Sequence, residues 1–304
     1  MIRYSLIIGL FIITSCTEKF EIQKSEAGNK LVVEGQIVNY NSGSCYSYIR
    51  LTKSKLGVNV TDHDAFFTHD SLTYINDAIV IVRDDFGNID TFKKEPEKYP
   101  YIWYDQDSVS HIDSSENYYY QRGYYRVNKL IPQENRTYYL TVQSEGKEYH
   151  ASCFMPHLPK MDSISFVNEA NYKGENGYTP YLYFKDPPQE KNYYLFIGNT
   201  GNTYWGYTVL DDKLIDPDVK GVNIFKGVTN EYWMSAFRFK GPYHYEVHSV
   251  TKEAYDFYNT LSKLYVNDGG NYKPAPASPI SNIDNGALGF FRASSVHVFD
   301  GIIQ

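Results

Sequence analysis

The chain has 304 residues, and with 42% hydrophobic and 17% aromatic residues it is too apolar for an intrinsically disordered protein. Its 31 tyrosines and 17 phenylalanines favour pleated sheets over a helical bundle. The formal net charge of -7 argues against a nucleic-acid partner, because such proteins neutralise phosphates with clustered Lys and Arg.

The N-terminus has the pattern of a secretory signal. Arg3 precedes a short apolar run, 5–13, which cannot cross a bilayer as a helix, since a span needs about 20 apolar residues. The run ends in Ile13-Thr14-Ser15-Cys16, which resembles the bacterial lipobox, in which the cysteine is lipidated. We therefore expect a signal peptide over 1–15 and a lipidated Cys16 on a flexible polar tether, 16–29. A plain signal peptide and a buried N-terminal strand are the alternatives.

Lipidation at Cys16 predicts a protein held to a membrane by acyl chains such as palmitate. Each buried methylene contributes about 0.8 kcal/mol, so several chains anchor a protein firmly. Glu18 stands where inner-membrane retention would favour Asp. The outer membrane is therefore the expected location in the cell envelope, on either its periplasmic or its cell-surface face.

Alternating apolar residues and turn signals predict a β-sandwich domain over 30–155. Its expected strands are short segments bounded by Gly and Asn, and they lie at 31–38, 48–52, 78–82, 124–127, 137–142 and 148–152. The last two flank Ser144-Glu145-Gly146-Lys147, a sequence typical of a tight hairpin turn.

Two prolines suggest a domain boundary. Pro156 and Pro159 cannot lie in a central strand, so we expect a second, β-rich domain over 160–304. One helix is expected near 251–266, because apolar residues recur there at helical spacing after a capping Ser249 or Thr251. The predicted class is thus all-β and mainly antiparallel, with one helix in the second domain.

Cys45 and Cys153 are the two cysteines that remain after Cys16. An oxidising compartment permits a disulfide between them. Two unrelated buried thiols are the alternative, and the sequence slightly favours it.

Several segments in order along the chain resemble a family of Bacteroidetes outer-membrane lipoproteins, the domain-of-unknown-function 4249 family. The segments that carry the resemblance are Leu31-Val32-Val33-Glu34-Gly35, Asp77-Ala78-Ile79-Val80-Ile81, Met155-Pro156, Asn192-Tyr193-Tyr194, Ser281-Asn282-Ile283-Asp284-Asn285-Gly286 and Gly289-Phe290-Phe291. The resemblance implies an outer-membrane location and a transthyretin-like or immunoglobulin-like N-terminal sandwich. Genes of the family often neighbour those of TonB-dependent receptors, which implies an accessory role in uptake. The resemblance supplies no catalytic residues. Asp77 and Asn135 stand where the family more often has Gly, and Asn tolerates positive φ.

Two groups of polar residues could bind metals, but solvation explains them more simply. Asp62-His63-Asp64 with His69-Asp70 lacks a recognised ligand spacing. His244, Glu246 and His248 alternate along a strand, so they share one face, and we expect that face to be solvated. No metal or other cofactor is predicted.

The segment 99–125 is the best candidate for a partner-binding surface. It is expected to be a long loop with many aromatic residues and mostly acidic charges, and such side chains are typical of contact surfaces. The residues predicted to bind are Trp103, Tyr104, Tyr118, Tyr119 and Tyr120. Ordinary strands with a polar loop are the alternative, in a chain rich in Tyr throughout.

These patterns predict a non-catalytic binding or accessory subunit, with a TonB-dependent receptor as its expected protein partner and the membrane as its anchor. The alternative is a structural or envelope-assembly lipoprotein that binds only other proteins. An enzyme is not expected, because the sequence holds no nucleophile-and-base motif, no metalloprotease motif and no phosphate-binding loop.

Overall fold

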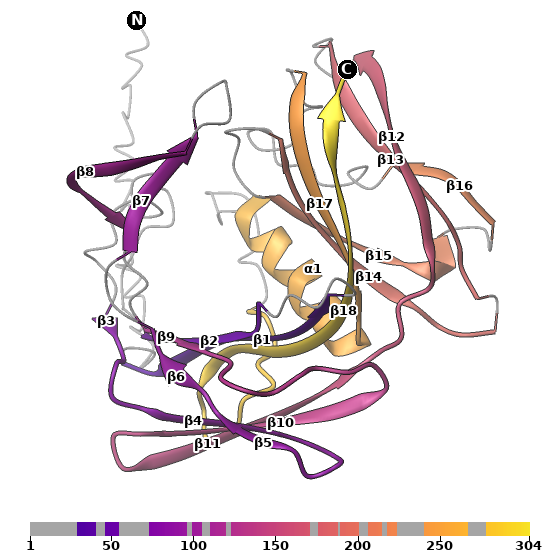
Figure 1. Cartoon of the computed structure of the whole chain (residues 1–304). Coiled ribbons are helices and arrows are strands. Elements are labelled where there is room, and N and C mark those ends of the chain that lie inside the picture. Colours follow the sequence, from indigo (N-terminus) through magenta and orange to yellow (C-terminus); the bar gives the residue numbers. More distant parts are fainter. Residues whose placement is uncertain are drawn as a thin grey trace, which may run out of the picture.

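A computed structural model describes most of the chain after the predicted tether. The described residues are 29–40, 46–54, 73–95, 99–104, 110–119, 123–170, 176–187, 189–200, 206–214, 218–223, 240–266 and 278–304. They form strands and a single α-helix, so the predicted class, all-β and mainly antiparallel, is confirmed (Figure 1).

A nine-stranded sheet runs through the whole molecule. Its order is β15-β14-β17-β18-β1-β2-β9-β6, with β3 paired to β2. The bounds are β15 Gly206–Asp211, β14 Tyr193–Thr200, β17 Gly241–Val250, β18 Leu288–Ile303, β1 Leu31–Tyr40, β2 Tyr48–Lys53, β9 Tyr124–Arg126, β6 Lys93–Lys94 and β3 Thr73–Tyr74.

A four-stranded sheet covers one face of β1, β2 and β18 and makes the first sandwich (Figure 1). Its order is β11-β10-β4-β5, with bounds β11 Lys147–Met155, β10 Arg136–Ser144, β4 Ile79–Asp84 and β5 Ile89–Thr91. Every second residue of β10 and β11 is buried, as half-buried strands require. Glu145 and Gly146 both have positive φ at the β10–β11 turn, which confirms the predicted hairpin.

The upper part of the large sheet lies between two further layers. A three-stranded sheet, β12-β13-β16, packs on one side through a core that includes Phe184, Tyr194 and Tyr245. Helix α1, Lys252–Val266, packs on the other side against Leu195 and Phe290 (Figure 1). The remaining bounds are β12 Met161–Ala170, β13 Asn176–Lys185, β16 Asp218–Asn223 and a 3-10 turn Asp212–Leu214.

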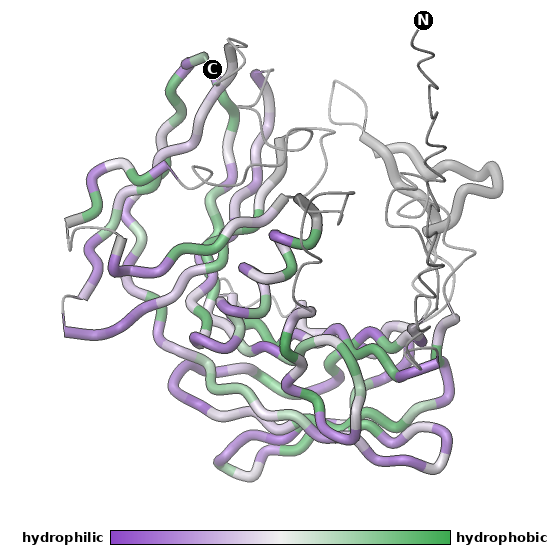
Figure 2. The backbone as a smooth tube through the Cα atoms, turned by 180° about the vertical axis from the view of Figure 1, so that it is seen from behind, coloured by the Kyte–Doolittle hydropathy of each residue, from purple (hydrophilic) through white to green (hydrophobic). Residues whose placement is uncertain are grey.

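The helix follows the expected pattern. Thr251 caps it, since the backbone N–H of Ala254 donates to the Thr251 hydroxyl at 3.3 Å. Hydrophobic and hydrophilic residues alternate along α1 at the spacing of its turns (Figure 2). The predicted helix is confirmed.

Strand β18 joins the two halves of the chain. Its first half pairs in parallel with β1, from Val32 opposite Leu288 to Tyr40 opposite Val296, and its second half pairs with β17. Both halves belong to one continuous strand of 16 residues. The core of the first sandwich contains Phe291 and Ala293 of β18. Because a strand from the second half of the chain contributes to this core, the domain boundary at 155–160 stays a prediction, which a folding experiment can test.

The predicted aromatic loop contains a hairpin. Strands β7, Tyr99–Tyr104, and β8, Ser110–Tyr119, pair antiparallel, with an irregularity between Pro100 and Tyr101. The expectation of a long loop over 99–125 is therefore wrong. The many tyrosines of this segment favour strands, and two strands form there and pair. Among the described strands, β7 and β8 pair only with each other.

Candidate functional site

One face of the large sheet carries stacked arginines and tyrosines on the side opposite the first sandwich core. Alternation places them there, because Ile49, Leu51 and Tyr125 point into that core and their neighbours point away. We call this surface the Arg–Tyr face, and it consists of Tyr46, Tyr48, Arg50, Tyr124 and Arg126.

The guanidinium groups of the Arg–Tyr face lie against aromatic rings. The Cζ of Arg126 is 5.0 Å from the ring centre of Tyr46 and 5.6 Å from those of Tyr48 and Tyr124. The Cζ of Arg50 is 5.2 Å from the Tyr124 ring. These distances are within the range of cation–π attraction. The rings of Tyr48 and Tyr124 are themselves 5.1 Å apart, so the face is a continuous stack.

Each arginine of the Arg–Tyr face has an acidic partner. Arg50 is 3.4 Å from one carboxylate oxygen of Glu34, and Arg126 is 4.0 Å from a carboxylate oxygen of Glu95. The other carboxylate oxygen of Glu34 accepts a hydrogen bond from the Tyr48 hydroxyl at 3.0 Å. Burial, and then the nearby Glu34 carboxylate, raise the pKa of Tyr48 well above its ordinary value, so this tyrosine stays protonated. The buried Nε of Arg50 has no hydrogen-bond partner.

The Arg–Tyr face is partly exposed. The side chains of Arg50 and Arg126 are 21% and 20% exposed, and Tyr46 is 60% exposed. Planar guanidinium groups donate to carboxylates and stack on flat groups, and tyrosine rings pack on peptides and sugars. The arrangement suits a partner segment that offers both a flat group and a hydrogen-bond acceptor.

A buried polar network continues from β1 across β18 to β17. Arg292 donates to Gln36 at 2.5 Å and to the Nδ1 of His248 at 3.0 Å, while the Nε2 of His248 lies 2.8 Å from Glu246. The Tyr40 hydroxyl donates to the same carboxylate at 2.9 Å. The network thus ties three neighbouring strands together through side chains.

The hydrogen-bond donors of the network show where the protons of His248 lie. Arg292 can only donate, so the Nδ1 of His248 accepts and its Nε2 carries the proton toward Glu246. Burial, followed by the charge of Arg292, lowers the pKa of His248 to about 4, so this histidine is neutral at pH 7. Burial favours the neutral form of Glu246, but hydrogen bonds from His244 and His248 outweigh it and lower the pKa of that carboxyl.

The alternation predicted for β17 is confirmed, but the reason given for its polar face is wrong. Tyr245 and Val247 point into the core shared with β12 and β13, and the other face holds Glu246 and His248. His248 is fully buried, not solvated. The sequence of β17 alone could not show this, because the covering partner Arg292 comes from β18.

Four of the five residues predicted to bind a partner lie on the β7–β8 hairpin. Trp103 pairs with His111 and Tyr104 with Ser110, whereas Tyr118 and Tyr119 pair at the opposite end of the hairpin. The backbone thus separates the predicted set into two groups. Tyr120 lies outside the described residues. The hairpin is inserted between β6 and β9, so it leaves the large sheet at the strand that carries Tyr124 and Arg126.

The cysteine predictions stay untested. Cys16 and Cys45 lie outside the described residues, as do 62–64 and 69–70. Cys153 is a buried free thiol, and its Sγ accepts the backbone N–H of Ala293 at 3.2 Å. Burial raises the pKa of Cys153 to about 11, so the thiol is unreactive at neutral pH.

Comparison with known families decides which proteins this chain resembles. The profile described as "Domain of unknown function (DUF4249)" matches residues 17–299. The chain belongs to this DUF4249 family. No curated protein matches it.

In the part that the structure describes, no three His, Cys, Asp or Glu side chains come together as metal ligands, and no helix there is long and apolar enough to cross a membrane.

The structure assigns physical roles to two segments that suggested this DUF4249 membership. Gly35 lies opposite Phe291, and a Cβ on Gly35 would come within 2.7 Å of the Ile49 side chain. Tyr193 and Tyr194 point to opposite faces of β14, so one packs on Tyr255 of α1 and the other on Phe184. These segments hold the layers together, and neither contributes a residue to the Arg–Tyr face.

Proposed function

We propose that this DUF4249 protein is a lipid-anchored, non-catalytic binding subunit of the bacterial outer membrane, which holds a receptor protein through the β7–β8 hairpin and the Arg–Tyr face. The observation that carries the proposal is that β7 and β8 pair, among the strands described, only with each other. A lone two-stranded sheet is marginally stable in water. A partner that packs on the hairpin, or adds a strand to its edge, would supply the missing contacts.

The composition of the hairpin supports a protein partner. Its strands hold Trp103 and Tyr104 near one end and three tyrosines at the other. Trp and Tyr dominate the energetics of interfaces, because they bury a large area while keeping a polar group for hydrogen bonding. Arginine is the other residue enriched there, and the Arg–Tyr face offers two arginines, one of them on β9, the strand that follows the hairpin in the chain.

The signal sequence supports the anchoring part of the proposal. The charge at Arg3, the apolar run 5–13 and Cys16 together have the lipoprotein pattern. A TonB-dependent receptor is the proposed partner, because the family resemblance implies that setting. A lipid anchor would hold this subunit beside such a receptor and so raise its effective concentration.

Affinity purification from membranes tests the partner. The full-length protein with Trp103→Ala and Tyr104→Ala should recover the receptor at least tenfold less well, because removal of one interface anchor costs about 2 kcal/mol. A matched control, Phe86→Ala with Phe154→Ala, removes two exposed aromatics from the first sandwich. The control should keep wild-type recovery. Undiminished recovery with the hairpin variant would contradict the proposed role of the hairpin.

Fractionation tests the anchor. Cys16→Ala should abolish incorporation of labelled palmitate and move the protein from the membrane to the soluble fraction. Cys153→Ala is the matched control, because Cys153 is a buried thiol that is not part of the signal sequence. A Cys16→Ala protein that stays quantitatively with washed membranes would show that something other than acylation holds it there.

A further inference from the structure

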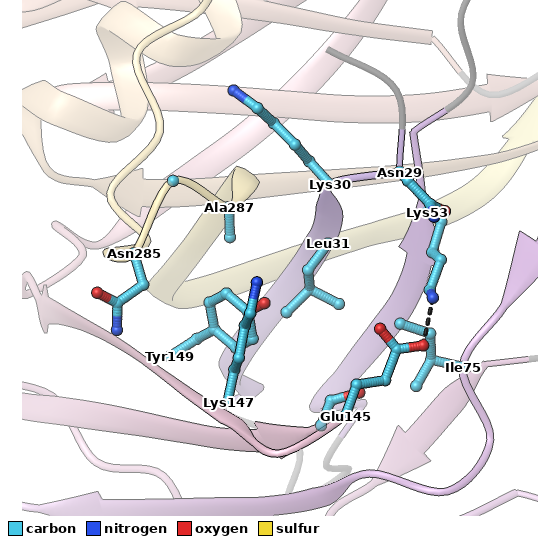
Figure 3. A pocket seen from close by; sticks show the side chains of 12 residues that line it. Asn29, Lys30, Leu31, Lys53, Ile75, Glu145, Lys147, Tyr149, Asn285 and Ala287 are labelled. Carbon is cyan, nitrogen blue, oxygen red and sulfur yellow. Dashed lines mark hydrogen bonds and ion pairs between the residues drawn. The ribbon is translucent and has the colours of Figure 1, made fainter. Parts of the chain in front are cut away.

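A lysine-lined pocket lies where the described chain begins (Figure 3). The start of β1, the end of β2, the β10–β11 turn and the turn before β18 all contribute to it, and it encloses about 270 Å³. This volume is just below the range of about 300 Å³ and more that drug-sized ligands occupy, so the pocket suits a small polar group.

The pocket is positively charged. Among its described lining residues are three lysines, Lys30, Lys53 and Lys147, and one acid, Glu145. Glu145 forms an ion pair with Lys53 and so leaves Lys30 and Lys147 to set the local charge (Figure 3). The chain as a whole has a formal charge of -7. The pocket is therefore a locally positive site in a protein that is negative overall.

Turns fix the shape of the pocket. Asn29, Glu145, Gly146, Asn285 and Gly286 all have positive φ. Hydrogen bonds hold two of these turns in place. The backbone N–H of Asn29 donates to the backbone carbonyl of Ser54, and the side-chain amide of Asn285 donates to the backbone carbonyl of Glu148. The pocket is therefore preorganised.

The position of the pocket indicates its ligand. Asn29 lines it, and only the segment 17–28 separates that residue from Cys16. Twelve residues span at most about 40 Å when fully extended, so a lipid on Cys16 keeps this end of the first sandwich near the bilayer. We propose that the pocket binds the phosphate group of an anionic membrane lipid and thereby sets the orientation of the protein on the membrane. This inference rests on the lipid anchoring proposed above.

Vesicle binding tests the inference without the anchor. The mature chain with Cys16→Ser carries no lipid, and its negative net charge disfavours general attraction to an anionic surface. It should sediment with vesicles that contain phosphatidylglycerol and stay free of vesicles made of phosphatidylcholine alone. Lys30→Gln with Lys147→Gln should weaken binding about 25-fold, because each lysine at an anionic surface contributes about fivefold.

The matched control is Lys93→Gln with Lys160→Gln, which removes two exposed lysines that do not line the pocket. The control should bind as the wild type does. Equal weakening by both pairs, or no binding to anionic vesicles, would overturn the proposal. Binding of inorganic phosphate to the protein, measured by calorimetry, without any binding to anionic vesicles would also overturn it, because the pocket would then take a free anion and not a lipid headgroup. Labelling of Cys16 and recovery of the receptor are separate readouts, so the anchoring proposal can fail or stand independently.

Discussion

The side-chain amide of Asn282 forms hydrogen bonds with both backbone groups of Phe291. Its Oδ1 accepts the Phe291 N–H at 2.8 Å, and its Nδ2 donates to the Phe291 carbonyl at 2.7 Å. Strand β18 pairs with β1 on its other edge here, and its pairing with β17 begins only at Ser295. Asn282 therefore satisfies a strand edge that no other strand of the described residues reaches.

Replacement of Asn282 should destabilise the first sandwich. Asn282→Ala leaves two backbone groups of a buried strand without partners, so we expect the free energy of unfolding to fall by about 2 to 3 kcal/mol. Urea denaturation followed by near-ultraviolet circular dichroism measures this. Asn128→Ala, at an exposed position, should change the same quantity by less than about 0.5 kcal/mol. Equal effects of the two variants would refute the role of Asn282.

Two glycines with similar backbone conformation separate steric clash from conformational strain. Gly289 has φ +98, and a Cβ there would lie 2.0 Å from the carbonyl oxygen of Val33. Gly87 has φ +88, and a Cβ there would meet nothing within 4 Å. Gly87→Ala should therefore cost about 1 kcal/mol, whereas Gly289→Ala should also separate β1 from β18 and cost several times more. Thermal melts of both variants measure the difference, and similar melting temperatures would contradict the close approach of the two strands.

Short-range patterns were enough to predict local structure. The hairpin at Glu145 and Gly146, the helix capped by Thr251 and the alternation of β17 all follow from neighbours within a few residues. The parallel pairing of β1 with β18 joins segments more than 250 residues apart, and no local pattern encodes it. The Arg–Tyr face was missed for the same reason: alternation in 48–52 predicted the strand, but only tertiary structure stacks Arg50 on Tyr124.

The shared core changes what we expect of an isolated first domain. The sequence predicts that a fragment from Lys30 to Met155 folds cooperatively. Its core, however, includes Ile283, Phe291 and Ala293 from beyond that fragment. We now expect the fragment to melt without cooperativity and to bind a hydrophobic dye, because its open face would expose apolar surface. Calorimetry of the fragment beside the whole mature chain tests this, and a cooperative transition in the fragment would restore the domain boundary at 155–160.

Buried His248 should make the protein sensitive to acid. Its folded pKa of about 4 lies below the ordinary value of 6.5, because burial and then Arg292 oppose the charged form. A histidine with a lowered pKa binds its proton more readily in the unfolded chain. Its contribution to stability is therefore complete above pH 6.5 and is lost as the pH falls toward 4. At pH 5 the loss amounts to about 2 kcal/mol.

The measurement is the free energy of unfolding at pH 7.5 and pH 5, in the wild type and in His248→Gln. His248→Gln should lose less stability between the two than the wild type does. His150→Gln is a control of opposite sign, since hydrogen bonds to Asp284 and Glu148 raise the pKa of His150, and its contribution is lost as the pH rises. An equal acid response in the wild type and in His248→Gln would show that His248 is not the neutral, buried member of the network.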